Sequence, residues 1–148
     1  MRKAGTPLVL LLLGCVLALV GCSPTAPIPT PSPVQIVGTW THGDDIVQIN
    51  SDGTFEISGM PKGVIEQASV PRGASPAGPA EKVSGTWSIG SGGTDVGGAP
   101  GVRLAFESPA RIGYNTGLTL IVADGTPFKL YVTLGRPDSG VRYNFSRK

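Results

Sequence analysis

The side chains best suited to metal or acid–base chemistry are scarce in this chain. Its 148 residues include two cysteines and one histidine. Both cysteines, Cys15 and Cys22, lie in the first 22 residues, and His42 precedes the segment Gly43-Asp44-Asp45. A zinc site takes three or four ligands, usually His or Cys. The residue content therefore predicts no metal site, and we expect no cofactor.

Two catalytic hypotheses can be written from the remaining residues. In the first, His42 is a general base that a neighbouring aspartate orients. Gly43-Asp44-Asp45 is also an ordinary turn sequence, however, and we favour the turn. In the second, Glu56, Glu107 and Asp124 are the carboxylates of an envelope hydrolase. These three residues fall on outward strand positions or in turns, so no pair is expected inside a pocket, and we predict that the protein is not an enzyme.

Tyr114 is the candidate binding residue. It lies in the loop 113–117, and the strand alternation described below assigns the other aromatic residues to the inside. Exposed loop aromatics often bind ligands, so one hypothesis is that the Tyr114 ring stacks on a sugar or a peptide. The alternative is that the ring covers its own loop. We expect the binding surface to be a rim formed by the loops Gly59–Glu81, Gly90–Gly101 and Ser108–Thr116.

The first 21 residues have the pattern of an export signal. Arg2 and Lys3 precede a largely apolar run of 13 residues, from Leu8 to Val20. This run is shorter than the ~20 residues that a permanent transmembrane helix needs. A basic start followed by a short apolar run is typical of a signal peptide. We therefore predict that residues 1–21 are removed.

The end of this run carries the sequence Leu19-Val20-Gly21-Cys22. It resembles the lipobox of bacterial lipoproteins, in which a small residue stands directly before the cysteine that receives lipid. The resemblance implies a diacylglyceryl thioether on Cys22, cleavage before that residue, and acylation of the new amino group. Two acyl chains anchor a protein stably. Two alternatives stay open: an ordinary secretory signal, and a lipobox at Leu12-Leu13-Gly14-Cys15.

Residues 22–33 are predicted to be a lipidated, proline-rich tether. Five prolines occupy positions 24 to 33, which favours extended polyproline II at ~3.1 Å per residue. We expect this spacer to lift a domain of residues 34–148 by up to roughly 30 Å from the membrane. The alternative is a proline-rich ligand for a recognition domain, but a tether suits a lipid-anchored chain better.

Residues 34–148 are predicted to be all-β, an antiparallel meander of about eight strands in a small closed or nearly closed barrel. Alternating apolar and polar residues put one face of each strand in the core, and closure removes two unpaired sheet edges. Residues 62–68 can form one helical turn. The expected strands are 37–41, 46–50, 54–58, 82–89, 102–107, 117–123, 128–134 and 141–146. The expected inner side chains are Trp40, Phe55, Trp87, Leu104, Phe106, Leu120, Leu130, Val132, Tyr143 and Phe145.

One segment of this domain is repeated, because Val37-Gly38-Thr39-Trp40 returns as Ser84-Gly85-Thr86-Trp87. We expect each glycine to admit a close neighbour and each tryptophan to fill the core or an open barrel end. The first Gly-x-Trp resembles the lipocalin and calycin pattern. Together with the segments Asn50–Phe55 and Gly135–Phe145, the repeat is also similar to small uncharacterised lipoproteins of high-GC Gram-positive bacteria. That resemblance implies no particular activity.

Charge argues against one class of partner. The chain has 12 basic and 10 acidic residues, so removal of Arg2 and Lys3 with the signal leaves equal numbers of each. A neutral domain offers no electrostatic footprint for nucleic acid. We therefore predict a lipid-anchored, non-catalytic module at the extracytoplasmic face of the cell membrane. Its partner is expected to be an unknown envelope protein or a small apolar ligand.

Substitution of Cys22 tests the predicted anchor. We expect Cys22→Ser to release the protein from the membrane fraction or to leave it at its uncleaved size, because serine has no thiol to receive the lipid. Cell fractionation followed by gel electrophoresis measures both properties. A Cys22→Ser protein that stays in the membrane fraction at its mature size would contradict lipidation.

Overall fold

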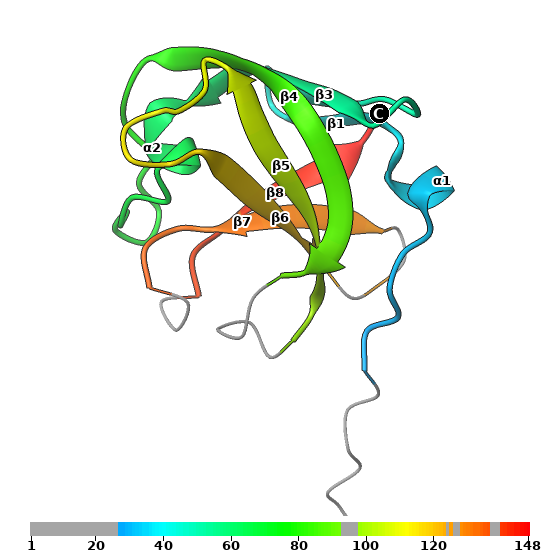
Figure 1. Cartoon of the computed structure of the whole chain (residues 1–148). Coiled ribbons are helices and arrows are strands. Elements are labelled where there is room, and N and C mark those ends of the chain that lie inside the picture. The colour runs from blue at the N-terminus through cyan, green and yellow to red at the C-terminus, as the bar shows by residue number, and fades with distance from the viewer. Residues whose placement is uncertain (1–26, 93–97, 124, 126–127, 137–139) are drawn as a thin grey trace, which may run out of the picture.

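The computed structural model describes residues 27–92, 98–123, 125, 128–136 and 140–148. These residues form an all-β domain whose strands close into one antiparallel barrel (Figure 1). The strands are β1 Gly38–His42, β2 Asp45–Ile49, β3 Thr54–Pro61, β4 Ala80–Ser91, β5 Pro100–Ser108, β6 Gly117–Ala123, β7 Lys129–Thr133 and β8 Arg142–Arg147. Each strand pairs with the next along the chain, and β8 pairs with β1. The predicted eight-stranded meander is therefore confirmed.

The barrel closes between its first and last strands. Trp40 of β1 pairs with Arg147 of β8, and Thr41 pairs with Ser146. The backbone amide of Lys148 extends this contact by donating to the carbonyl of Thr39 at 2.9 Å. The two strands that would be the edges of an open sheet thus satisfy each other's backbone groups, which is the expected advantage of closure.

The interior of the barrel is filled by its own side chains. Of the ten predicted inner residues, nine are less than 9% exposed, and Trp87 is half-buried against the same core. The largest fully buried side chains include Trp40, Phe55 and Phe145. An eight-stranded barrel is just wide enough inside for its side chains. An eight-stranded barrel can also hold one small ligand, and here buried side chains occupy that space.

The connections lie at two opposite ends of the barrel, because successive antiparallel strands turn at alternate ends. The helix α1 (Pro33–Ile36) precedes β1 at what we term the α1 end, with the β2–β3, β4–β5 and β6–β7 connections. The helix α2 (Lys62–Ile65) joins β3 to β4 at the α2 end, with the other connections. Figure 1 shows the two helices on opposite sides.

This arrangement corrects the predicted binding rim. The loops Gly59–Glu81 and Ser108–Thr116 connect strands at the α2 end, as expected of neighbours on one rim. The loop Gly90–Gly101 connects β4 to β5 and therefore belongs to the α1 end. The prediction of one rim from three loops is wrong, because loop composition says nothing of which end a connection occupies. The helical turn expected within residues 62–68 is present as α2.

Part of the predicted tether belongs to the folded domain. Pro31 is buried, and Ile28 packs against the hydrophobic core. The domain therefore extends at least to Ile28, which corrects the predicted boundary at residue 34, and apolar contact is the reason. The predicted signal peptide, residues 1–21, lies outside the described residues. In the described ranges, neither helix has the length and hydrophobicity needed to cross a membrane.

The two repeated glycines are sites of close approach, as predicted. A Cβ atom on Gly38 would lie 3.1 Å from Nε of Arg147. Gly38 also has a φ of +144°, a conformation that other residues rarely adopt. A Cβ atom on Gly85 would overlap the carbonyl oxygen of Ala105 on the neighbouring strand. Both glycines are therefore required by the packing of the barrel wall.

Two alanine substitutions on β4 test this packing. Gly85→Ala should lower the free energy of unfolding by about 1–3 kcal/mol, because the added methyl group forces β4 away from β5. Gly90→Ala is the matched control, since its Cβ atom would have Arg103 Cδ at 3.4 Å as its nearest neighbour, an ordinary contact. Equilibrium unfolding in denaturant measures both variants. Equal unfolding free energies for the two would contradict the close approach.

Candidate functional site

The side chain of Tyr114 is fully exposed at the tip of the β5–β6 connection. Ile112 and Asn115 form a two-stranded bridge, with backbone N···O distances of 2.9 and 3.0 Å. Gly113 and Tyr114 are the two residues of the turn, and Gly113 has the φ of +57° that such a turn requires. The Tyr114 side chain is 100% exposed. The alternative that this ring covers its own loop is therefore wrong.

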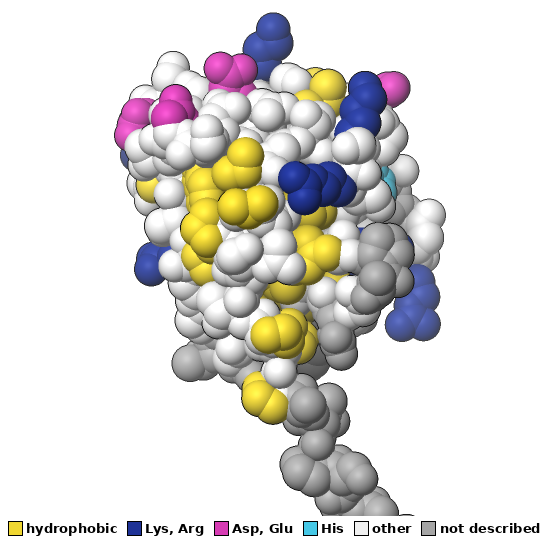
Figure 2. All heavy atoms as spheres, turned by 90° about the vertical axis from the view of Figure 1, so that its right-hand side faces the viewer, with side chains coloured by type: hydrophobic (Ala, Val, Ile, Leu, Met, Phe, Trp, Pro, Cys, Tyr) yellow, Lys and Arg dark blue, Asp and Glu magenta, His cyan; other side chains and the backbone are white. Residues whose placement is uncertain are grey.

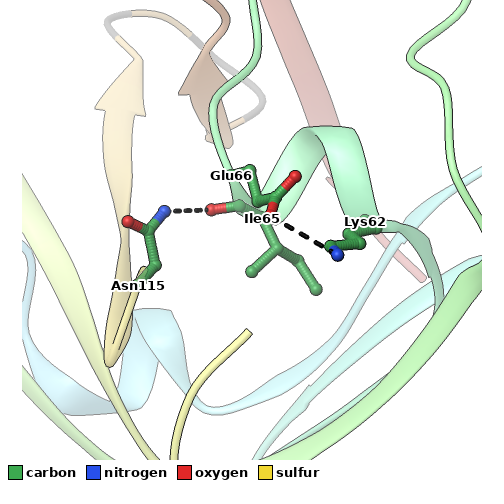
Figure 3. Close-up of polar contacts among 4 residues, drawn as sticks. All are labelled: Lys62, Ile65, Glu66 and Asn115. Carbon is green, nitrogen blue, oxygen red and sulfur yellow. Dashed lines mark hydrogen bonds and ion pairs between the residues drawn. The ribbon is translucent and has the colours of Figure 1, made fainter. Parts of the chain in front are cut away.

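This hairpin is held in place by α2. The side-chain amide of Asn115 donates to the carbonyl of Ile65 at 2.7 Å (Figure 3). Gly113 lies so close to the carboxylate of Glu66 that a Cβ atom would overlap it. Glu66 in turn forms an ion pair with Lys62 at 3.7 Å. Since Ile65 is fully buried, the exposed ring is attached to a helical turn that is itself anchored in the core.

A hollow lies next to this hairpin, between α2 and the segment that follows it. It has a volume of about 370 Å³ and shares Glu66 with the Gly113 contact. The segment is fixed by hydrogen bonds from the Gly63 amide to Ala77 and from the Gly135 amide to Gln67, both 2.9 Å long. The hollow is lined by Lys62, Gly63, Glu66, Ala68, Ser69, Val70, Pro71, Ser75, Ala77 and Gly78.

Tyr131 is a second outward aromatic residue, and it contradicts the prediction that every aromatic residue except Tyr114 points inward. It occupies the position between the inward residues Leu130 and Val132 of β7, yet it is only 6% exposed. The guanidinium group of Arg142 lies over its ring, 4.4 Å from the ring centre. Tyr114 is therefore the aromatic residue of the chain that presents its whole ring to solvent.

His42 does not form the pair that a catalytic base requires. Its Nδ1–H donates to the carbonyl of Asn144 at 2.7 Å, and its ring stacks on Tyr143 with 3.8 Å between ring centres. The buried carboxylate of Asp45 accepts a hydrogen bond from the Tyr143 hydroxyl, and Asp44 is exposed. The aspartate that could orient the imidazole thus binds a tyrosine, and the arrangement is that of a packed polar cluster.

The pair of Asp45 and Tyr143 is not among the residues predicted from the sequence, although a signal is present. Asp45 has the same strand parity as the inward residues Val47 and Ile49, so alternation already points it into the barrel. A buried carboxylate needs a hydrogen-bond donor. Burial raises the pKa of Tyr143 well above its ordinary value, and the hydrogen bond to Asp45 and the charge of that carboxylate raise it further.

The carboxylates proposed for a hydrolase do not share a site in the described part of the chain. Glu56 is exposed on β3 and lines a shallow hollow with Lys82, Ser84 and others. Glu107 is exposed on β5 and does not line that hollow, and Asp124 lies outside the described residues. Within the described ranges, no three His, Cys, Asp or Glu side chains are grouped closely enough to hold a metal ion.

Three hollows on the described part of the surface are lined without either tryptophan. Trp40 is fully buried, and its indole N–H donates to the carbonyl of Ile36 at 2.8 Å. The indole N–H of Trp87 donates to the carbonyl of Asn50, also at 2.8 Å. Both tryptophans thus fill the barrel and hold its connections at the α1 end.

Comparison of the chain with protein-family models gave no match, and comparisons with curated proteins and with solved structures gave none either. The resemblances to bacterial lipoproteins and to lipocalins therefore stay predictions. The candidate lipidation site, Cys22, lies outside the described residues and stays a prediction as well.

Removal of one hydroxyl group tests the cluster of Asp45 and Tyr143. Tyr143→Phe should lower the free energy of unfolding by about 1–3 kcal/mol at neutral pH, because it leaves the buried carboxylate without its donor. This deficit should shrink as the pH rises above about 10, the ordinary pKa of tyrosine. Above that pH the unfolded wild-type chain loses the Tyr143 proton while the folded protein keeps it. This proton loss lowers the free energy of unfolding of the wild type and has no counterpart in Tyr143→Phe.

Unfolding curves of both proteins at several pH values between neutrality and strong alkali provide the measurement. The difference between the two unfolding free energies is the quantity to follow, since ionisation of other groups affects both proteins alike. A difference that stays constant over the whole pH range would contradict a raised pKa at Tyr143.

Proposed function

We propose that this protein is a lipid-anchored, non-catalytic binding module on the extracytoplasmic face of the cell membrane. Cys22 carries the lipid, and the barrel binds an envelope partner through its α2 end. The observation that carries the choice of surface is the fully exposed ring of Tyr114. The eight other aromatic rings of the chain are buried or half-buried, so this ring is set apart from the core.

The fixed hairpin that carries Tyr114 favours binding of a partner. A tyrosine ring supplies a large contact area with few rotatable bonds, and tyrosines are enriched among the residues that dominate binding energies. Here its hairpin is fixed by the Asn115–Ile65 hydrogen bond and by the contact of Gly113 with Glu66. A side chain that is held in position before binding loses less entropy on binding. The entropy of ordering the Tyr114 hairpin is therefore lost during folding and not during binding.

The filled interior favours an outer binding surface over an enclosed apolar ligand. Side chains such as Trp40, Phe55 and Phe145 are fully buried inside the barrel, and in this proposal the barrel acts as a rigid support. The hollow beside α2, about 370 Å³ in volume, provides a concave surface next to the hairpin. A partner that contacts Tyr114 and enters this hollow would touch both apolar and charged groups.

Two substitutions at one position test the surface. Tyr114→Ala should reduce the amount of envelope partner retained by the immobilised protein, whereas Tyr114→Phe, the matched control, should retain most of it because the ring remains. Neither change should shift the thermal midpoint, since the ring makes no core contact whose loss would cost the ~3–5 kcal/mol of a buried aromatic. Retention from solubilised envelope and thermal unfolding are measured on the same preparations.

Two results would contradict the proposal. Equal retention by wild type and Tyr114→Ala would remove Tyr114 from the binding surface. Hydrolysis of an envelope polymer by the purified domain, abolished by Glu56→Gln or Glu107→Gln, would favour the carboxylate hydrolase over a binding module.

A further inference from the structure

We propose that the α1 end of the barrel docks on the surface of the lipid bilayer, so that the α2 end faces away from the membrane. This inference rests on the proposed lipidation of Cys22. It goes further, because a lipid anchor alone leaves a domain free to tumble at the end of its tether. The length of the tether and the packing of its last residues set the orientation.

The stretch of chain between Cys22 and the packed residues is short. Among the described residues, which start at Pro27, Ile28 is the first that packs on the barrel. Five peptide units separate Cys22 from Pro27, and a fully extended chain spans about 3.3–3.6 Å per residue, which gives at most ~18 Å. This reach is well below the roughly 30 Å expected for a spacer that runs to residue 33. The barrel is therefore held close to the headgroups.

The tether is attached at one end of the barrel. Ile28 and Pro31 line a hollow of about 400 Å³ together with Val122 and Phe128, at the β6–β7 connection. Pro31 is buried, and α1 follows directly with the fully buried Ile36. Peeling this segment away would expose these apolar side chains to water, at a cost of about 25 cal/mol per Å². The anchor therefore pulls on the α1 end and not on a flexible arm.

The chemistry of the α1 end suits a lipid surface. Val34 on α1 is 80% exposed, and the hollow beside it is lined largely by apolar side chains. Lys129, Arg147 and Lys148 are exposed there, and Asp52 is the exposed acidic side chain among the described residues of this end. Asp95 and Asp124, in the β4–β5 and β6–β7 connections, lie outside the described residues. Figure 2 shows this side, with hydrophobic side chains across its middle, Lys and Arg beside them, and the acidic side chains in view near its upper edge.

The docked orientation places Tyr114 where a partner can reach it. The strand β5 runs from the α1 end to the α2 end over nine residues, Pro100–Ser108. At about 3.3 Å per residue and a tilt of ~35–45°, its projection on the barrel axis is about 20–25 Å. The exposed ring is therefore presented beyond the headgroups, while the apolar hollow beside the tether meets them.

Labelled cysteines on the lipidated protein test this orientation. The mature chain has no other free thiol, because Cys22 is its one cysteine and is linked to lipid. The same fluorophore is attached to Lys129→Cys at the α1 end or to Tyr114→Cys at the α2 end. The proteins are placed in phosphatidylcholine–phosphatidylglycerol vesicles that carry a headgroup quencher. We expect quenching to be several-fold stronger at position 129 than at position 114.

Two further variants separate the contributions of tether length and of the lipid to the quenching. A Gly/Ser segment inserted between Ser23 and Pro24 lengthens the tether and should lower the quenching at position 129 towards that at position 114. Cys22→Ser, prepared without residues 1–21, should abolish vesicle binding. Vesicle binding by that protein would refute the lipid anchor itself. Bound protein with equal quenching at both positions would overturn the docking while the anchor stands. Quenching at 129 that the longer tether leaves unchanged would overturn the part of the proposal in which tether length sets the orientation.

Discussion

The structure depends on the closure of the barrel around Trp40. Its indole N–H binds the carbonyl of Ile36 in α1, its ring meets Phe128 edge-on at 5.6 Å, and the Arg147 guanidinium lies 6.0 Å from it. Arg147 also donates to the Val37 carbonyl at 2.6 Å. One side chain thus joins the start of the domain, the β6–β7 connection and the last strand. The β1–β8 seam has few backbone pairs of its own, and this cluster supplies the remaining contacts that hold it shut.

The strands and their inner faces were predictable because strand parity is local information. Alternation in segments such as Val83 to Ile89 identifies which side chains point inward, and a shift of one residue would reverse every one of them. The assignment of loops to ends was within reach of the same reasoning, since a meander alternates its turns. The prediction that the loop Gly90–Gly101 lies on the same rim as the other two loops rests on composition alone. Composition does not show at which end of the barrel a loop lies.

The site was less predictable because its contacts join residues that are far apart in sequence. Strand alternation indicates that Tyr114 lies outside the strands. The position of its hairpin depends on the hydrogen bond from Asn115 to Ile65, which is 50 residues earlier in the sequence. Asp45 and Tyr143 are 98 residues apart and meet only when β8 returns beside β1. The parity of each residue is visible in the sequence, whereas the register that brings them together is set by closure of the whole barrel.

The placement of the tether at one end and the Tyr114 hairpin at the other has a mechanical consequence. With the proposed lipid anchor and the proposed partner in place, a pull between them would enter at α1, next to the start of β1, and leave through the β5–β6 connection, so tension would run broadly along the strands. The five residue pairs between β1 and β2 and the seam with β8 are then loaded together, in shear. Bonds that share a load must break at once, whereas a pull across the strands would open them one after another. In the proposed function, the barrel would therefore resist tension between the membrane anchor and the bound partner.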